Sequence, residues 1–209
     1  MAIQKQNQKN KPIPSEASRL TRDDWLDEAF KAVVEAGFDN VKVLSLAEKL
    51  KVTRGSFYWH FTDHADLISS LLMRWKVSQL ELDAKLKLQQ SGDALKDLDL
   101  VVDAAFLQAG SELENMRFEQ AMRALSHQHP LAAQLLVEVD ANRMDLFQSK
   151  FLVLVKDVNK ARDLAALLYL AIAGGFQALP PDSEGLRAHA LAVGFGAADE
   201  ARGKALAVG

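Results

Sequence analysis

Apolar residues recur at intervals of three and four along most of this 209-residue chain, and this spacing limits its fold more than any other feature. The clearest stretch carries Leu67, Ile68, Leu71, Leu72 and Trp75. These residues share one face of a helix but would fall on both faces of a strand. Strand-like alternation is nearly absent elsewhere. The sequence therefore predicts an all-α protein.

Helix start and stop signals divide the chain into segments. Thr21 followed by Asp24 is a capping-box pattern, Gly37 ends the same helix, and Asp63 caps a long helix that reaches about Leu88. A short helix is expected after Thr53. Further helices are expected at about 43–50, 95–114, 116–127, 130–156, 159–178 and 183–193, with looser structure after residue 194.

Composition narrows the setting of the protein. The absence of cysteine excludes disulfides and thiolate metal sites and favours a reducing compartment, so we expect a cytoplasmic location. The longest uncharged run, residues 164–181, contains a Gly pair and ends in two prolines, which suits a buried helix better than a membrane span. We therefore expect no membrane association, and no motif calls for a cofactor.

Charge is unevenly distributed. Residues 1–22 contain five lysines and arginines and one glutamate, a balance of +4, whereas the net charge of the chain is −3. A basic arm on an acidic body is typical of binding to phosphates at one end of the molecule, although a solubilising tail would look the same.

The stretch VTRGSFYWHF, residues 52–61, concentrates aromatic and polar side chains. On a helix capped by Thr53, Phe57 and Phe61 share a buried face, while Arg54 and Tyr58 point elsewhere. A short helix before it and a tight turn between them make a helix-turn-helix, in which the second helix reaches base edges in a major groove.

The stretch from Thr21 to about Ile68 resembles the DNA-binding domain of the tetracycline-repressor (TetR) family. LSLAEKLKVTRGSFYWHFTDHADLI is similar to the family signature, an Ala-containing helix, a Val-Ser/Thr turn and a Tyr-x-His-Phe ending before a long fourth helix. MRALSHQHPLAAQLLVEVDANRMDLF is similar to a segment common in the family's ligand-binding domains.

The resemblance implies three parts: a flexible basic arm (1–20), a helix-turn-helix domain (21–66) and a helical effector-binding and dimerisation domain (67–209). It implies a homodimeric transcriptional regulator, a repressor that releases a palindromic operator in double-stranded DNA when a small effector binds. The expected DNA contacts are Arg22, Lys49, Thr53, Arg54, Gly55, Ser56, Tyr58, Trp59, His60 and His64.

Three positions depart from the family pattern. Lys51 stands where glycine is usual in the turn, and a left-handed lysine there would be strained. Lys42 replaces a threonine cap. His64 replaces a lysine that commonly meets phosphate, which would make this contact depend on pH because histidine titrates near neutrality.

Two sets of residues are expected in the body. Apolar side chains that could line an effector pocket or fill the core are Trp75, Phe106, Phe118, Met122, Met144, Phe147 and Phe151. Small residues on the last long helix, among them Ala171, Gly174 and Gly175, are expected at the dimer interface, and an internal core helix is the alternative reading.

Two other function classes stay open on sequence alone. One is a helical protein-interaction module that uses Tyr58 and Trp59. The other is a helical enzyme, which the lack of any nucleophile or phosphate-loop motif disfavours, so we expect no catalytic residues. His60 and His64 have zinc-ligand spacing, but the helix start between them breaks that geometry, and we expect no metal.

Overall fold

The computed structural model describes residues 20–106 and 111–178, together with the single residues 192 and 196. These residues form helices and no strand, which confirms the all-α prediction. The elements are α1 (Arg22–Ala36), the 3-10 helix η1 (Phe38–Asn40), α2 (Val43–Lys49), α3 (Arg54–Phe57), α4 (His64–Leu88), α5 (Ala94–Phe106), α6 (Ser111–Ser126), α7 (Pro130–Val155) and α8 (Val158–Ala178).

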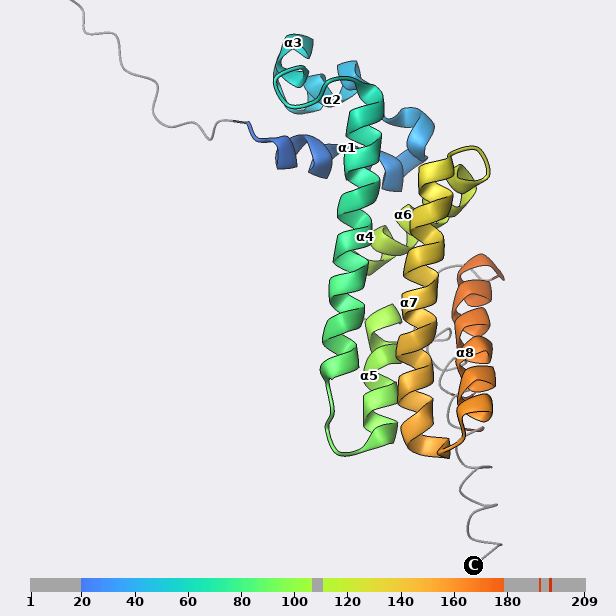
Figure 1. The fold of residues 1–209 in the computed structure, drawn as a ribbon. Helices are drawn as coiled ribbons and strands as arrows, with labels where there is room; N and C mark the ends of the chain where they lie inside the picture. Colours follow the sequence, from blue (N-terminus) through green and yellow to red (C-terminus); the bar gives the residue numbers. More distant parts are fainter. Residues whose placement is uncertain (1–19, 107–110, 179–191, 193–195, 197–209) are drawn as a thin grey trace, which may run out of the picture.

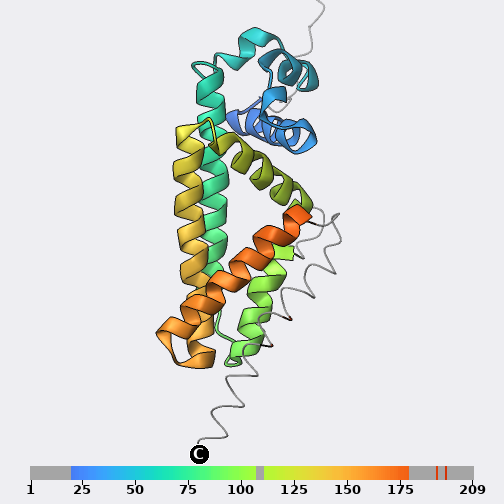
Figure 2. The ribbon, with the colours of Figure 1, turned by 90° about the vertical axis from the view of Figure 1, so that its right-hand side faces the viewer.

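The helices form two parts, which we call the head and the body. The head consists of α1, η1, α2, α3 and the start of α4, and the elongated body consists of the rest of α4 and of α5 to α8. Figure 1 shows α2 and α3 at one end of the molecule, with α4 leaving the head and running along the body beside α7. Turned by 90°, α6 lies obliquely beneath α1, and α8 crosses the body at an angle to α7 (Figure 2). Helix α4 therefore connects the head to the body.

The predicted helix boundaries depend on local hydrogen bonds. The Asp24 backbone N–H donates to Thr21 Oγ1 over 3.2 Å while Thr21 N–H donates to Asp24 Oδ2 over 2.6 Å, which confirms the capping box. Asp63 Oδ1 accepts from the Asp66 N–H at the start of α4, over 2.8 Å. Gly37 ends α1 with a φ of 80°, a conformation that favours glycine.

Two predicted helices differ in extent. The helix expected at 95–114 is two: α5 ends at Phe106, and Ser111 already begins α6. Helix α3 is a single turn, after which the Phe61 N–H donates to the Phe57 carbonyl over 3.1 Å in a turn.

The hydrophobic core is continuous between head and body. One cluster joins Trp25, Phe57 and Leu67 of the head to Phe118 of α6 and Leu135 of α7. A second cluster fills the far end of the body between α4, α5, α7 and α8. The boundary at residue 66 therefore stays a prediction, because side chains on both of its sides are buried in the same core.

Some expectations fall on other parts of the chain. The basic arm, apart from Leu20, and the helix at 183–193, apart from Ala192, lie outside the described residues. Within the described segments, no helix is both long enough and apolar enough to cross a membrane.

Lys51 offers a test of backbone strain. Its φ of 57° is left-handed, a conformation that costs a non-glycine residue about 1–2 kcal/mol. We expect Lys51→Gly to raise the free energy of unfolding by about 1 kcal/mol relative to Lys51→Ala, measured by urea denaturation. Lys85→Gly, on the exposed side of α4, is the control and should lower it by about 1 kcal/mol. Equal stability of the two Lys51 variants would contradict the strain.

Candidate functional site

The exposed end of the head carries two large aromatic side chains. Trp59 is 88% exposed and Tyr58 is 54% exposed, whereas Phe57 and Phe61 are buried with ring centroids 5.3 Å apart. Arg54 Nη2 lies 3.4 Å from the Tyr58 hydroxyl. The turn after α3 therefore buries one pair of aromatic rings and presents the other pair to solvent beside a guanidinium group.

A shallow groove beside α3 brings together three nitrogen-bearing side chains from different elements. Lys42 precedes α2, Arg54 begins α3 and His64 begins α4, and all three line this groove together with Asp39. His64 Nε2 lies 2.6 Å from the Val41 carbonyl oxygen, a contact that requires a proton on Nε2. Lys42 was not among the DNA contacts expected from the sequence. The feature that could have indicated it is a basic residue at the N-cap of α2, where its side chain makes no capping hydrogen bond.

Arg22 has partners within the chain. Its guanidinium donates to the His60 carbonyl and to Asp66 Oδ1, each over 3.4 Å, and to Ser70 Oγ. The same group lies 4.6 Å from the centroid of the Phe61 ring. Arg22 thus joins the start of α1 to the start of α4, so its expected DNA contact is not part of the set that we propose below.

Lys49 is also paired inside the head. Its ammonium lies 3.1 Å from Glu35 and 3.3 Å from Glu28, and hydrogen bonds to these two carboxylates raise the pKa of Lys49. Like Arg22, Lys49 is therefore held by carboxylates of the same chain, and we do not propose it as a DNA contact. The other expected contacts are near α3: Thr53 and Gly55 are exposed, and Ser56 and His60 are half-buried.

A cavity of about 110 Å³ lies in the body between α4, α5, α6, α7 and α8. Its wall combines hydrocarbon with polar groups. The lining residues are Gln79, Leu82, Asp83, Leu86, Val101, Ala104, Asn115, Met116, Glu119, Arg123, Arg143, Leu146, Phe147, Tyr169, Ile172 and Ala173.

Among the expected pocket residues whose side chains the structure describes, Phe147 alone lines this cavity. The others pack elsewhere because large apolar side chains at helical spacing serve the core first. Trp75, Phe118 and Met122 are buried in the core shared by head and body, Phe151 is buried at the far end, and Met144 packs partly buried beside it. The Phe106 side chain lies outside the described residues.

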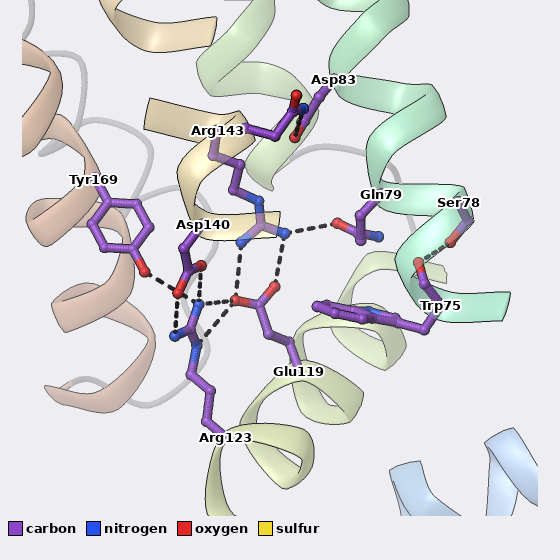
Figure 3. Close-up of polar contacts among 10 residues, drawn as sticks. Trp75, Ser78, Gln79, Asp83, Glu119, Arg123, Asp140, Arg143 and Tyr169 are labelled. Atoms are coloured by element: carbon purple, nitrogen blue, oxygen red, sulfur yellow. Dashed lines mark hydrogen bonds and ion pairs between the residues drawn. The ribbon is translucent and has the colours of Figure 1, made fainter. Parts of the chain in front are cut away.

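Glu119 lies between two guanidinium groups (Figure 3). Arg143 donates to both of its carboxylate oxygens, over 2.9 and 2.8 Å. Arg123 donates to Glu119 Oε1 through Nη2 and Nε, over 2.7 and 3.1 Å. Burial favours the neutral acid, but the charges of Arg143 and Arg123 outweigh it and hold the pKa of Glu119 below its usual value.

The network extends to α7, α8 and α4. Arg123 also donates to both oxygens of Asp140, over 3.1 and 2.7 Å, and its Nη2 lies 3.3 Å from the Tyr169 hydroxyl. Arg143 Nη2 donates to Gln79 Oε1 over 2.7 Å. Each guanidinium is thus held by at least one carboxylate and one neutral oxygen.

Asp83 is the remaining acid of the cavity wall, and it is only 5% exposed. Its Oδ2 accepts a hydrogen bond from Asn142 Nδ2 over 3.1 Å. Burial raises the pKa of Asp83, and the Asn142 bond and the charge of Arg143 offset this only in part.

Sequence reasoning missed the charged side chains of this cavity. A signal was available on α7, where Asp140 and Arg143 interrupt the apolar face formed by Val139, Leu146 and Phe147. Charged residues on a buried helical face are rarely left unpaired, so they pointed to an internal ionic network.

The expected dimer face of α8 divides into two sides. Ala165 and Leu168 are buried against the body of the same chain, whereas Leu167 and Leu170 are 53% and 63% exposed. Gly174 is exposed, with open space where a Cβ would stand. Ala171 is half-buried, and the side of Gly175 lies outside the described residues.

In residues 20–106 and 111–178, no three histidine, aspartate or glutamate side chains are grouped so that they could hold a metal ion.

Comparison with known proteins shows which regulators the head of this chain resembles. Residues 26–71 match the profile of bacterial regulatory proteins of the tetR family. The HTH-type transcriptional regulator AcrR of Shigella flexneri is 35% identical over 80 residues, which are 37% of this chain and 36% of that protein. The chain thus matches about a third of the length of this curated relative.

Two solved structures are similar over nearly the whole fold. A transcriptional regulator from Rhodococcus sp. Rha1 has a TM-score of 0.69 at 17% identity, covering 85% of this chain and 95% of its own. A regulator from Saccharomonospora viridis, in complex with choline, has a TM-score of 0.68 at 18% identity, covering 81% and 92%. Residues 26–71 therefore match the tetR family of bacterial regulatory proteins, and the two solved structures share the fold of the chain.

Glu119 allows a test of the ionic network. Glu119→Gln removes the carboxylate shared by two largely buried guanidinium groups, and we expect a loss of about 3 kcal/mol in the free energy of unfolding at neutral pH. Because the pKa of Glu119 is lowered in the folded state, this contribution is present above the usual glutamate range and is lost as pH falls below it.

Urea denaturation at several pH values measures this effect. Glu138→Gln is the matched control, since Glu138 forms an ion pair with Lys76 and its side chain is more exposed than that of Glu119, so it should matter less. A Glu119→Gln protein as stable as the control at neutral pH would contradict the network's role in the fold.

Proposed function

We propose that this protein is a DNA-binding transcriptional regulator that responds to a small ligand. In this proposal it acts in the cytoplasm as a homodimer, represses by occupying a palindromic operator and releases it when the effector binds. The observation that carries the proposal is the exposed set of Arg54, Tyr58 and Trp59 on a head whose core continues into a body with a polar cavity.

The DNA-binding face would be the surface around α3. Arg54 stands in the first turn of α3, the part of a helix-turn-helix that reaches base edges, and its guanidinium can bind guanine with two hydrogen bonds. Tyr58 and Trp59 would contact the sugar-phosphate backbone. Lys42 and His64, which line the groove beside Arg54, would add phosphate contacts that set the register.

Coupling between the two sites would follow α4 and α6. Helix α4 carries His64 at the head and Asp83 at the cavity, 19 residues later, or roughly 28 Å at about 1.5 Å per residue. On α6, Glu119 faces the cavity while its neighbour Phe118 stacks on Phe30 of α1 at 4.9 Å. A ligand that displaces α6 would therefore shift α1, and with it the two heads of a dimer.

The dimer would form through the outer sides of α7 and α8. On α8, Leu167, Leu170 and Gly174 leave an apolar strip exposed, and on α7 Val137 and Val153 are 69% and 64% exposed. An exposed apolar strip such as that of α8 is typical of a surface that a second copy covers. Two copies are required because a palindromic operator presents two half-sites.

The effector would occupy the cavity between α4 and α8. The choline bound by the Saccharomonospora neighbour is consistent with a small organic molecule in a body of this fold. The cavity's mixture of hydrocarbon wall and a few polar groups is also what ligand pockets have in common.

A protein-interaction module built on Tyr58 and Trp59 is the main rival. Salt separates the two functions, because phosphate contacts make affinity fall steeply with salt concentration whereas an apolar protein interface changes little. The deciding experiment is selection of fragments from genomic DNA by the purified protein, followed by a salt titration on the selected site. Recovery of no enriched palindrome would overturn the regulator proposal.

Arg54 and Tyr58 should have separable effects on the selected site. Arg54→Ala is expected to cost about 1–3 kcal/mol of binding free energy and to relax the preference at one position per half-site. Tyr58→Phe should weaken all sequences almost equally, because it removes a phosphate contact. Competition binding with single-base variants of the site measures the affinity and the base preference of each variant. Arg162→Ala, at an exposed position on α8, controls for the loss of a positive charge. Identical specificity profiles for the two variants would rule out this division of roles.

The dimer surface is tested by a charge on α8. Leu170→Glu would have to bury an unpaired carboxylate at the interface, so the variant is expected to be monomeric and to lose operator binding while keeping its helical content. Leu88→Glu, at a leucine that is 83% exposed near the end of α4, should stay dimeric. Multi-angle light scattering gives the masses, and a dimeric Leu170→Glu protein would exclude this strip as the interface.

A further inference from the structure

We propose that the cavity binds a small organic cation with an apolar body, and that the carboxylate of Asp83 is its counter-ion. The inference rests on the proposed function, in which this cavity holds the effector, and it specifies the chemical class of that effector. The observation behind it is a buried carboxylate in the cavity wall that has no cationic hydrogen-bond partner among the residues the structure describes.

The charges around the cavity do not balance. Two cations, Arg123 and Arg143, face three acids, Glu119, Asp140 and Asp83. Hydrogen bonds assign Glu119 to both arginines and Asp140 to Arg123, which leaves Asp83 with one neutral donor, Asn142. With Asp83 ionised, the group has one negative charge in excess, which a ligand cation would neutralise.

An anionic ligand does not fit the same arrangement. The guanidinium groups of Arg123 and Arg143 already donate to Glu119, Asp140 and Gln79. A carboxylate ligand would have to displace one of these acids and leave it buried without a partner, a change that is strongly unfavourable in a low-dielectric site. Asp83 is the acid of the described wall whose hydrogen-bond partner is neutral, so the ligand should bring positive charge.

The free protein bears a cost for holding Asp83. Burial raises the pKa of this carboxyl, and the charged groups facing it, Arg143 of α7 and Glu119 of α6, act in opposite directions. Because the folded-state pKa is raised, the ionised form destabilises the fold, and this penalty grows as pH rises above the usual aspartate range. A bound cation would remove the penalty, so binding should be tighter at neutral than at acid pH.

The rest of the wall limits the size and shape of the cation. Leu82, Leu86, Val101, Leu146 and Phe147 supply hydrocarbon around Asp83, and the cavity of about 110 Å³ admits only a few non-hydrogen atoms. Methyl groups on nitrogen would contact these side chains, and Phe147 is an aromatic side chain of the wall that a positive charge could contact. A tetraalkylated or primary ammonium ion of this size meets both requirements.

Three probes of nearly equal shape test the charge requirement: tetramethylammonium, neopentyl alcohol and pivalate. Isothermal titration of the full chain should detect tetramethylammonium binding and at least about tenfold weaker binding of the neutral and anionic probes. Asp83→Asn should weaken tetramethylammonium at least about tenfold yet leave the ligand-free protein as stable as the wild type or more so. Asp145→Asn, on the exposed side of α7, is the matched control and should bind normally.

The outcomes separate this inference from the proposed function. Binding of pivalate or neopentyl alcohol as tight as that of tetramethylammonium would overturn the proposal that the ligand is a cation. Unchanged tetramethylammonium binding by Asp83→Asn would overturn it as well. Absence of binding by all three probes, in a protein that still selects an operator, would also overturn the cation while leaving the regulator intact. Failure to select any DNA in the ligand-free state would instead count against the regulator itself.

Discussion

The packing of Phe118 against the head is the contact on which the rest of the structure depends. Its ring stacks on Phe30 at 4.9 Å, meets Phe38 edge-on at 5.5 Å and lies 6.2 Å from Trp75. One side chain of α6 therefore joins α1, η1 and α4 in a single core. Aromatic packing of this kind is directional as well as apolar, so the head cannot rotate on the body without breaking it. A conformational change that starts in the body would therefore reach the head through this aromatic cluster or along α4.

The body combines two ways of filling space, and they serve different purposes. At its far end, apolar side chains from four helices close the core. In the middle, Glu119, Arg123 and Arg143 occupy volume that leucine or phenylalanine would fill more favourably, because buried ion pairs recover little more than their desolvation cost. A cavity lined by fixed charges is poor as a core and well suited to recognition. Glu119 of its wall is the neighbour in sequence of Phe118, so a ligand in the cavity would lie close to the contact between α6 and the head.

The head shows a similar division among its cations. Arg22 and Lys49 are held by carboxylates of the same chain and stabilise the arrangement of α1, α2 and α4. Arg54 instead lies exposed beside Tyr58, and Lys42 lines the groove next to it. Sequence position did not separate these roles, since all four residues are basic and lie within or beside the helix-turn-helix. The carboxylate partners of Arg22 and Lys49, which lie 14 to 44 residues away in sequence, separate them from Arg54 and Lys42.

The sequence by itself determined the helical class, the helix starts at Thr21 and Asp63, the stop at Gly37 and the family of the head, because periodicity and capping are local properties of the chain. Tertiary structure alone decided which apolar residues face a cavity and which face the core: Phe147 and Phe118 look alike in sequence, yet only Phe147 lines the cavity. It also decided that Asp83, within the described part of the chain, lacks the cationic hydrogen-bond partner that Glu119 and Asp140 have. Both outcomes depend on how five helices cross, and the crossing is set by the summed packing of side chains that are distant in sequence, which no local pattern encodes.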